Sequence, residues 1–171
     1  MEWALAVDLG TSGPKVSLVA ADGRVLGSAT EPTRLHLLPG GGCEQDPDDW
    51  WRAITVAATR VTREHPVEAS RVVAVGMTAQ WSGTVPVGAD GRPVGRAIIW
   101  LDRRGAALIQ QVIGGPVRVS GYGIGKILRW VRLTGGAPGR SGKDSIAHIL
   151  WLREARREVF EATKVFLEPK D

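Results

Sequence analysis

A glycine-rich turn close to the N-terminus carries the residues best suited to bind a phosphate group. It reads Asp8-Leu9-Gly10-Thr11-Ser12-Gly13-Pro14-Lys15 and follows a short apolar run. The two glycines let the backbone approach a ligand closely. The hydroxyls and N–H groups of the turn can donate hydrogen bonds to phosphate oxygens, and the lysine adds a positive charge. The segment therefore predicts a phosphate-binding turn.

The aspartate that opens this turn has two interpretations. Asp8 ends a strand that we predict to be buried, where an unpaired carboxylate is costly. A hydrated cation would be a suitable partner for it. Alternatively, the carboxylate caps the turn through its own backbone. Short Gly-Thr-Ser sequences also occur by chance, so the pattern alone leaves both interpretations open.

The elements that must position this turn begin with three predicted strands. Residues 3–7 and 16–20 are apolar runs, and residues 24–30 form the third strand. The glycine-rich turn joins the first two strands, and Asp22-Gly23, a strong hairpin signal, joins the next two. The sequence therefore predicts an antiparallel meander at the N-terminus.

A helix is predicted after this meander. Asp46 is a good N-cap, Pro47 suits the first helical position, and two further acidic residues lie at the positive end of the helix dipole. The helix should carry Trp50 through about Arg63 and end before Pro66.

The rest of the chain mixes strand and helix signals. Residues 72–77 predict a buried strand. Residues 84–87 and 97–100 flank a turn sequence and predict hairpin-like strands. Helical spacing or glycine breakers mark three later helices, over residues 103–112, 124–133 and 143 to about 160. The plan is a mixed α/β layer structure.

Several segments, taken in order, resemble motifs of the FGGY carbohydrate kinases, a family of the actin-like, ribonuclease-H-like superfamily. The similar segments are the phosphate turn followed by Asp22-Gly23, and residues 44–51, 76–83, 98–104, 149–154 and 164–171. The resemblance spans nearly the whole chain. Each motif is weak alone, and their joint order makes the resemblance specific.

This resemblance implies a fold and an activity. The fold is an α/β, ribonuclease-H-like domain with a mixed sheet, the meander and flanking helices. The activity is in-line transfer of a phosphate from ATP, with Mg²⁺, to a sugar. The resemblance implies that Asp8 positions magnesium and phosphate. The residues implied beside the transferred phosphate are Gly10, Thr11, Ser12, Gly13 and Lys15. The residues implied in or near the sugar pocket are Gln80, Trp81, Ser82, Asp102 and Arg103.

Two positions bear on the substrate. Xylulokinases usually have a histidine where this chain has Ser82, whose hydroxyl can still bond a sugar hydroxyl. Glycerol-kinase-like members have Arg-Glu in place of Trp81-Ser82, which makes glycerol the weaker candidate. Trp81 could also be a core residue, although an indole suits a sugar face. We expect a ketose such as D-xylulose, or a related pentulose or polyol.

No residue of this sequence matches the catalytic base of the FGGY kinases. These kinases use a later aspartate of the first domain, and no acidic residue after Asp102 fits that pattern. We therefore expect residues 1–171 to be an incomplete N-terminal domain, without the ATP-binding C-terminal domain and without efficient activity alone. Two alternatives stay open: an inactive fragment that binds sugar or phosphate, and a non-metabolic actin-like ATPase domain.

Composition excludes some classes of protein. The 171 residues are 43% hydrophobic with a net charge of +4, and the positive charge is spread out without interleaved aromatic residues, so we expect no nucleic-acid partner. No apolar run reaches the length of a membrane helix, so we expect no membrane partner. A single cysteine and no secretion signal favour the cytoplasm. A homodimer is possible.

Overall fold

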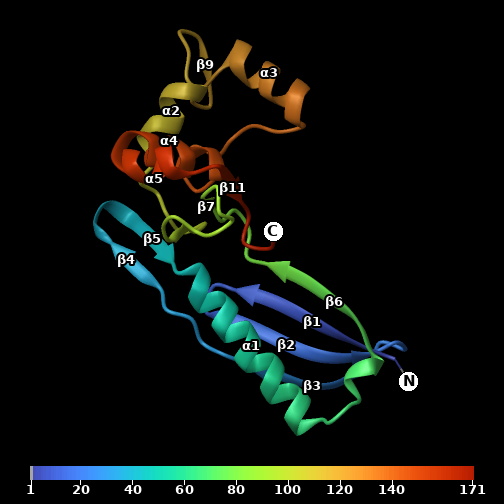
Figure 1. The fold of residues 1–171 in the computed structure, drawn as a ribbon. Coiled ribbons are helices and arrows are strands. Elements are labelled where there is room, and N and C mark those ends of the chain that lie inside the picture. Colours follow the sequence, from blue (N-terminus) through green and yellow to red (C-terminus); the bar gives the residue numbers. More distant parts are fainter. Residues whose placement is uncertain (1) are drawn as a thin grey trace.

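The computed structural model describes residues 2–171, and Figure 1 shows two bodies. A four-stranded sheet covered by one long helix forms one body, and shorter helices and strands form the other. The elements in chain order are β1 (Trp3–Gly10), β2 (Gly13–Ala20), β3 (Val25–Thr30), β4 (His36–Leu38), η1 (Pro39–Gly41), β5 (Gly42–Gln45), α1 (Pro47–Glu64), η2 (Ala69–Arg71), β6 (Val72–Ala79), β7 (Val85–Val87), β8 (Ala97–Ile98), α2 (Ala106–Ile113), β9 (Arg118–Val119), β10 (Tyr122–Gly123), α3 (Ile124–Thr134), α4 (Ser145–Ala155), α5 (Arg157–Ala162) and β11 (Val165–Leu167).

The predicted meander is confirmed. The large sheet has the order β3-β2-β1-β6, in which β1, β2 and β3 are antiparallel neighbours and β6 runs parallel to β1. The sheet is therefore mixed, as expected for the predicted α/β fold. Because β6 is the parallel neighbour of β1, the loop after β6 lies beside the turn after β1.

Helix α1 begins and ends close to the predicted positions. The Asp46 carboxylate accepts a hydrogen bond from the Asp48 N–H at 3.0 Å, and Pro47 is the first helical residue. The helix ends at Glu64, before Pro66. Its buried face packs mainly on β2, where small and β-branched side chains from helix and sheet form one cluster.

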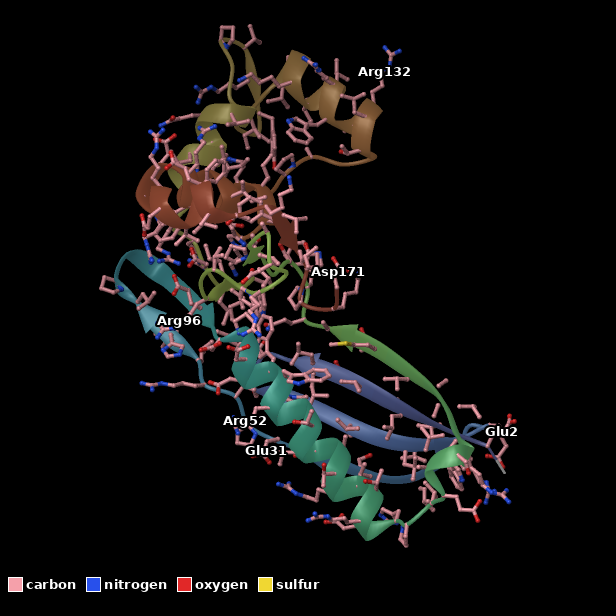
Figure 2. The ribbon with its side chains drawn as sticks, in the orientation of Figure 1. Glu2, Glu31, Arg52, Arg96, Arg132 and Asp171 are labelled. Atoms are coloured by element: carbon pink, nitrogen blue, oxygen red, sulfur yellow. The ribbon has the colours of Figure 1, made fainter. Side chains whose placement is uncertain are left out.

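Strand β6 was predicted to be buried, and that prediction is wrong. Val73 and Val75 are 60% and 68% exposed, because β6 lies at the edge of the sheet and α1 covers its neighbours. An apolar run indicates that a strand tends to be buried, but it does not show whether a helix covers that strand in the folded sheet. The uncovered strand borders an apolar groove of about 320 Å³ with α1 and the last residues of the chain. Figure 2 shows Asp171 near the end of β6.

The predicted hairpin-like connection between residues 84–87 and 97–100 is confirmed in part, because the two segments also pair with distant strands. Both predicted strands form, but β7 pairs with β11 and β8 pairs with β5. The two segments also meet each other in an antiparallel bridge between Thr84 and Ile98, whose backbone groups exchange hydrogen bonds at 2.8 and 3.0 Å, and Val87 forms a second bridge with Pro93. The longer ladders join distant segments, and both arms of the connection pack in one core cluster with Ile99 and Cys43.

The later helices form where predicted, with one break. Helix α2 ends before Gly114 and α3 ends before Gly135, which adopts a left-handed conformation. The single helix predicted over residues 143–160 is two helices, α4 and α5, separated at Arg156 (φ −135°, ψ 57°). The break lets Val159 pack with Ile98. Among residues 2–171, no helix is both long and apolar enough to cross a bilayer.

We expect Gly13→Ala to destabilise the fold by roughly 2 kcal/mol or more. Gly13 has φ +134°, and a Cβ atom there would lie 2.0 Å from the carbonyl oxygen of Glu31. Urea unfolding followed by circular dichroism measures the loss. Gly23→Ala is the matched control, since Gly23 also has positive φ but its Cβ would meet nothing within 4 Å. Equal losses in both variants would contradict the steric argument.

Candidate functional site

The predicted phosphate turn is the hairpin between β1 and β2. Thr11 and Ser12 form its tip, and Gly10 and Gly13 face each other across it. The Thr33 N–H donates to the Ser12 carbonyl at 3.2 Å, which fixes the tip against the segment that leads to β4. The turn is not followed by a helix, so a bound phosphate would meet turn N–H groups without a helix dipole behind them.

Asp8 lies on the sheet face opposite α1. Its direct neighbours are Lys15 on β2 and Thr78 on β6, and all three residues are exposed and border an open hollow of about 400 Å³. The expected burial of Asp8 is wrong, because this residue is exposed and its charge therefore does not by itself require a cation. The alternation of β1 explains this: Val7 and Leu9 turn to the core, which turns Asp8 outward.

A hydrogen-bonded group joins the turn to the loop after β6. The Thr11 hydroxyl donates to Gln80 Oε1 (3.0 Å), and Gln80 Nε2 donates to Gln45 Oε1 (2.7 Å). Gln45 Nε2 donates to the Thr11 carbonyl (2.9 Å) and to the Thr33 hydroxyl (3.1 Å). The Trp100 indole N–H donates to the Thr11 hydroxyl (3.0 Å). The predicted phosphate and sugar segments are therefore in direct contact.

The loop after β6 carries the predicted sugar residues Gln80, Trp81 and Ser82, and we call it the sugar loop. It has one exposed side chain, Trp81, and one buried side chain, Ser82. Trp81 is 68% exposed, so the interpretation that it is a core residue is wrong. Ser82 is buried and has φ 55°, an uncommon conformation for a residue other than glycine. Its hydroxyl donates to the Lys143 carbonyl at 2.9 Å, so only its oxygen lone pairs remain for a ligand. Lys143 Nζ in turn lies 5.0 Å from the Trp100 ring centroid.

Glu168 supports this loop from the end of the chain. Its carboxylate accepts hydrogen bonds from the Gly83 N–H (3.1 Å) and the Ser145 hydroxyl (2.8 Å). Together with Lys170 it borders a hollow of about 360 Å³, whose other walls are the sugar loop and the end of β6. Thr78 borders both this hollow and the one at Asp8, so the two lie next to each other at the end of β6.

Asp102 and Arg103, the other predicted sugar residues, lie in a different environment. Asp102 is 1% exposed, and its carboxylate accepts hydrogen bonds from the Cys43 N–H (2.8 Å), the Arg104 N–H (2.9 Å) and Arg104 Nε (2.9 Å). Arg104 also pairs with buried Glu44 at 2.7 Å. These contacts give Asp102 a structural role in joining β5 to the start of α2. Arg103 is exposed, and contact of either residue with a sugar stays a prediction.

A buried histidine lies behind the sugar loop. His148 is fully buried on α4, and its Nδ1 lies 3.0 Å from the Thr84 hydroxyl. Its Nε2 has no hydrogen-bond partner among residues 2–171. Burial lowers the pKa of His148 to about 4, and the nearby charges of Asp102 and Asp144 oppose that shift only in part. The imidazole is therefore neutral at pH 7.

Sequence reasoning missed four residues that shape the site. They are Gln45, Thr78, Trp100 and Glu168. The sequence marks Gln45 only as part of a helix start and Trp100 only as part of a motif. Strand alternation could have found Thr78, since the register that turns Asp8 outward turns Thr78 to the same face. No local signal marks Glu168, because its contacts are 23 and 85 residues away.

Comparison with known proteins assigns this chain to a family. The model of the N-terminal domain of the FGGY family of carbohydrate kinases matches residues 3–171. A glycerol kinase from Citrifermentans bemidjiense is 34% identical over 113 residues, which cover 66% of this chain and 23% of the relative. A xylulose kinase from Streptomyces coelicolor is 32% identical over 169 residues, which cover 98% of this chain and 32% of the relative.

Solved structures agree on the fold. The "xyloylose kinase" of Brucella ovis has a TM-score of 0.85 at 24% identity, covering 99% of this chain and 32% of that chain. The glycerol kinase of Plasmodium falciparum, solved with ADP, has a TM-score of 0.77 at 21% identity over 99% of this chain and 33% of its own. The chain belongs to the FGGY family of carbohydrate kinases and spans a third or less of the length of these relatives.

Proposed function

We propose that this chain forms the sugar-binding part of an ATP-dependent kinase that phosphorylates a ketose such as D-xylulose, or a related pentulose or polyol. Family membership supports a carbohydrate kinase. The observation that carries the proposal further is the 3.0 Å hydrogen bond between Thr11 and Gln80. It holds the predicted phosphate turn and sugar loop side by side, as transfer between a nucleotide and a sugar requires.

The residues around Asp8 fit a magnesium ion that arrives with a nucleotide. Mg²⁺ is usually held by one or two carboxylates together with substrate phosphates and waters. Asp8 offers one exposed carboxylate with Lys15 and Thr78 beside it, and residues 2–171 contain no group of three or more potential ligands. A bound Mg²⁺ would neutralise phosphate charge. In this proposal the Lys15 ammonium attracts the phosphates, and the turn N–H groups orient them.

The sugar end of the site supports a substrate with a longer carbon chain than glycerol. Trp81 offers an open indole face that can cover sugar C–H groups, while its N–H donates to a hydroxyl. Ser82 contributes an acceptor. Glycerol offers little surface to such a face. The relatives include both glycerol and xylulose kinases, so this preference rests on the side chains.

A panel of acceptors with the protein that carries this chain tests the proposal. ADP release should require both Mg²⁺-ATP and an acceptor, with D-xylulose or another pentulose giving a higher kcat/KM than glycerol. An equal rate of ADP release with and without an acceptor would support an actin-like ATPase instead. Acceptor binding by calorimetry without ADP release would support a binding fragment.

Within that assay, we expect Asp8→Asn to lower kcat roughly 100-fold, since it removes the charge that would position magnesium and phosphate. Asp22→Asn is the matched control, because Asp22 is also a carboxylate at a hairpin of the same sheet, and its hydrogen bonds within residues 2–171 are to Arg24. It should leave kcat unchanged. Full activity in the Asp8 variant would remove Asp8 from the proposed site.

A further inference from the structure

Thr11, Gln45 and Gln80 form a closed ring of hydrogen bonds. Gln45 donates to the Thr11 carbonyl, Gln80 donates to Gln45, and the Thr11 hydroxyl donates back to Gln80, at 2.9, 2.7 and 3.0 Å. The three residues are 34, 35 and 69 positions apart and come from the end of β5, the loop after β6 and the β1–β2 turn. The ring therefore joins three separate segments.

The direction of every hydrogen bond in the ring follows from two fixed groups. The Thr11 carbonyl can only accept, so the amide nitrogen of Gln45 must face it, and the Gln45 oxygen must face Gln80. Gln80 then turns its nitrogen to Gln45 and its oxygen to the Thr11 hydroxyl. The Trp100 indole N–H can only donate, which makes the same hydroxyl an acceptor there and leaves its proton for Gln80. The Thr11 carbonyl and the Trp100 indole N–H therefore require the same set of hydrogen-bond directions.

This arrangement changes the role expected for Thr11. Its one hydroxyl proton is donated to Gln80, so it cannot be donated to a phosphate without opening the ring. Phosphate oxygens are acceptors and need donors. The Thr11 side chain is therefore a connector between segments, and phosphate contact at this residue is left to its backbone.

We propose that Gln45 is a positioning residue, and that the ring sets the placement of the phosphate turn relative to the sugar loop. This inference rests on the proposed function and deepens it. Gln45 is fully buried and borders neither hollow, so it acts through Thr11 and Gln80 without touching a ligand. Phosphoryl transfer depends on reacting atoms held about 3 to 3.5 Å apart, and a misplacement of about 1 Å can cost on the order of 100-fold in rate.

Steady-state kinetics of the active protein with single and double variants tests the proposal. Thr11→Val and Gln45→Met keep side-chain volume and open the ring, and each should lower kcat about 100-fold with KM values for ATP and acceptor changed less than about threefold. Because both open one ring, the double variant should be no more than about threefold slower than Thr11→Val alone. Thr11→Ser keeps the hydroxyl and should restore kcat.

Thr33→Val is the matched control. Its hydroxyl accepts the second N–H of Gln45 but lies outside the ring, so kcat should stay near the wild-type value. The Trp100 indole N–H resonance, assigned with Trp100→Phe, should shift in Thr11→Val and stay in Thr11→Ser. These readouts separate positioning from general loss of stability, which thermal unfolding of each variant measures.

Three outcomes would overturn the inference: a folded Gln45→Met variant with wild-type kcat, KM rising while kcat is unchanged, or fully additive losses in the double variant. A wild-type protein without acceptor-dependent ADP release overturns the proposed function instead. That result is visible before any variant is compared, so the two failures are distinct.

Discussion

Arg104→Met is expected to destabilise the protein by about 3 to 5 kcal/mol at pH 7, measured as the change in free energy of unfolding in urea. Arg104 lies between the carboxylates of Glu44 and Asp102, with both ion pairs at 2.7 Å. The side chains of all three are no more than 10% exposed. The guanidinium also stacks 3.6 Å from the Trp151 ring centroid.

The expected loss is large because of what the substitution leaves behind. Two acidic groups stay buried and close together without the cation, which removes their attraction to it and adds repulsion between them. The backbone N–H groups of Cys43 and Arg104 still bond Asp102, so that carboxylate cannot turn to solvent without breaking them. A buried charge without a partner is among the costliest defects in a folded protein.

Arg103→Met is the matched control, since it makes the same substitution at the exposed neighbour. We expect a change within about 0.5 kcal/mol, as for most surface substitutions. If Arg104→Met and Arg103→Met unfold at the same urea concentration, the buried cluster contributes nothing and the explanation is wrong.

The second large effect is a loss of stability in acid. His148 has a pKa of about 4 in the folded protein against an ordinary value of 6.5, because burial disfavours its charged form. The unfolded chain therefore binds more protons than the folded one between these values, so stability is complete above pH 6.5 and falls as pH decreases. Linkage gives a loss of about 2 kcal/mol by pH 5 and about 3 kcal/mol by pH 4.

Unfolding curves between pH 7 and pH 5 measure this loss before most carboxylates titrate. His148→Asn keeps a polar group toward Thr84 but does not titrate, so its stability should change less over this range. His36→Asn is the control at a partly exposed position. An equal dependence on pH in the wild type and in His148→Asn would show that another group is responsible.

Local signals in the sequence were enough for some elements and not for others. Helix α1 was predicted almost to the residue because its N-cap, first-position proline and stop signal are all adjacent to it. Strands β4, β5 and β11 were missed because three or four residues show no clear period by themselves, whereas β7 and β8 were predicted from the turn sequence between them. The pairing of β7 with β11 joins residues about 80 apart, and no local pattern encodes it.

Local signals in the sequence were likewise enough to predict some features of the candidate site and not others. The turn from Asp8 to Lys15 was predicted because glycines and polar residues follow an apolar run there, and the loop at Gln80 was predicted from the resemblance to the FGGY kinases. Their contact with each other depends on the parallel pairing of β1 with β6, which the sequence did not predict. The resemblance placed Asp102 near the sugar, and it could not show that this carboxylate is buried and bonded to Cys43 and Arg104.

The outer edge of β6 is a feature that we expect to lower the solubility of the protein when it is exposed. An edge strand has backbone N–H and C=O groups without a neighbouring strand, and β6 adds exposed Val73, Val75 and Met77. Such an edge is a template for pairing with another β-strand, and natural proteins usually protect it with charge, proline or a covering segment. The side chains of β6 include no charge and no proline. Wherever this edge is left open, we expect strand addition at β6 to favour aggregation.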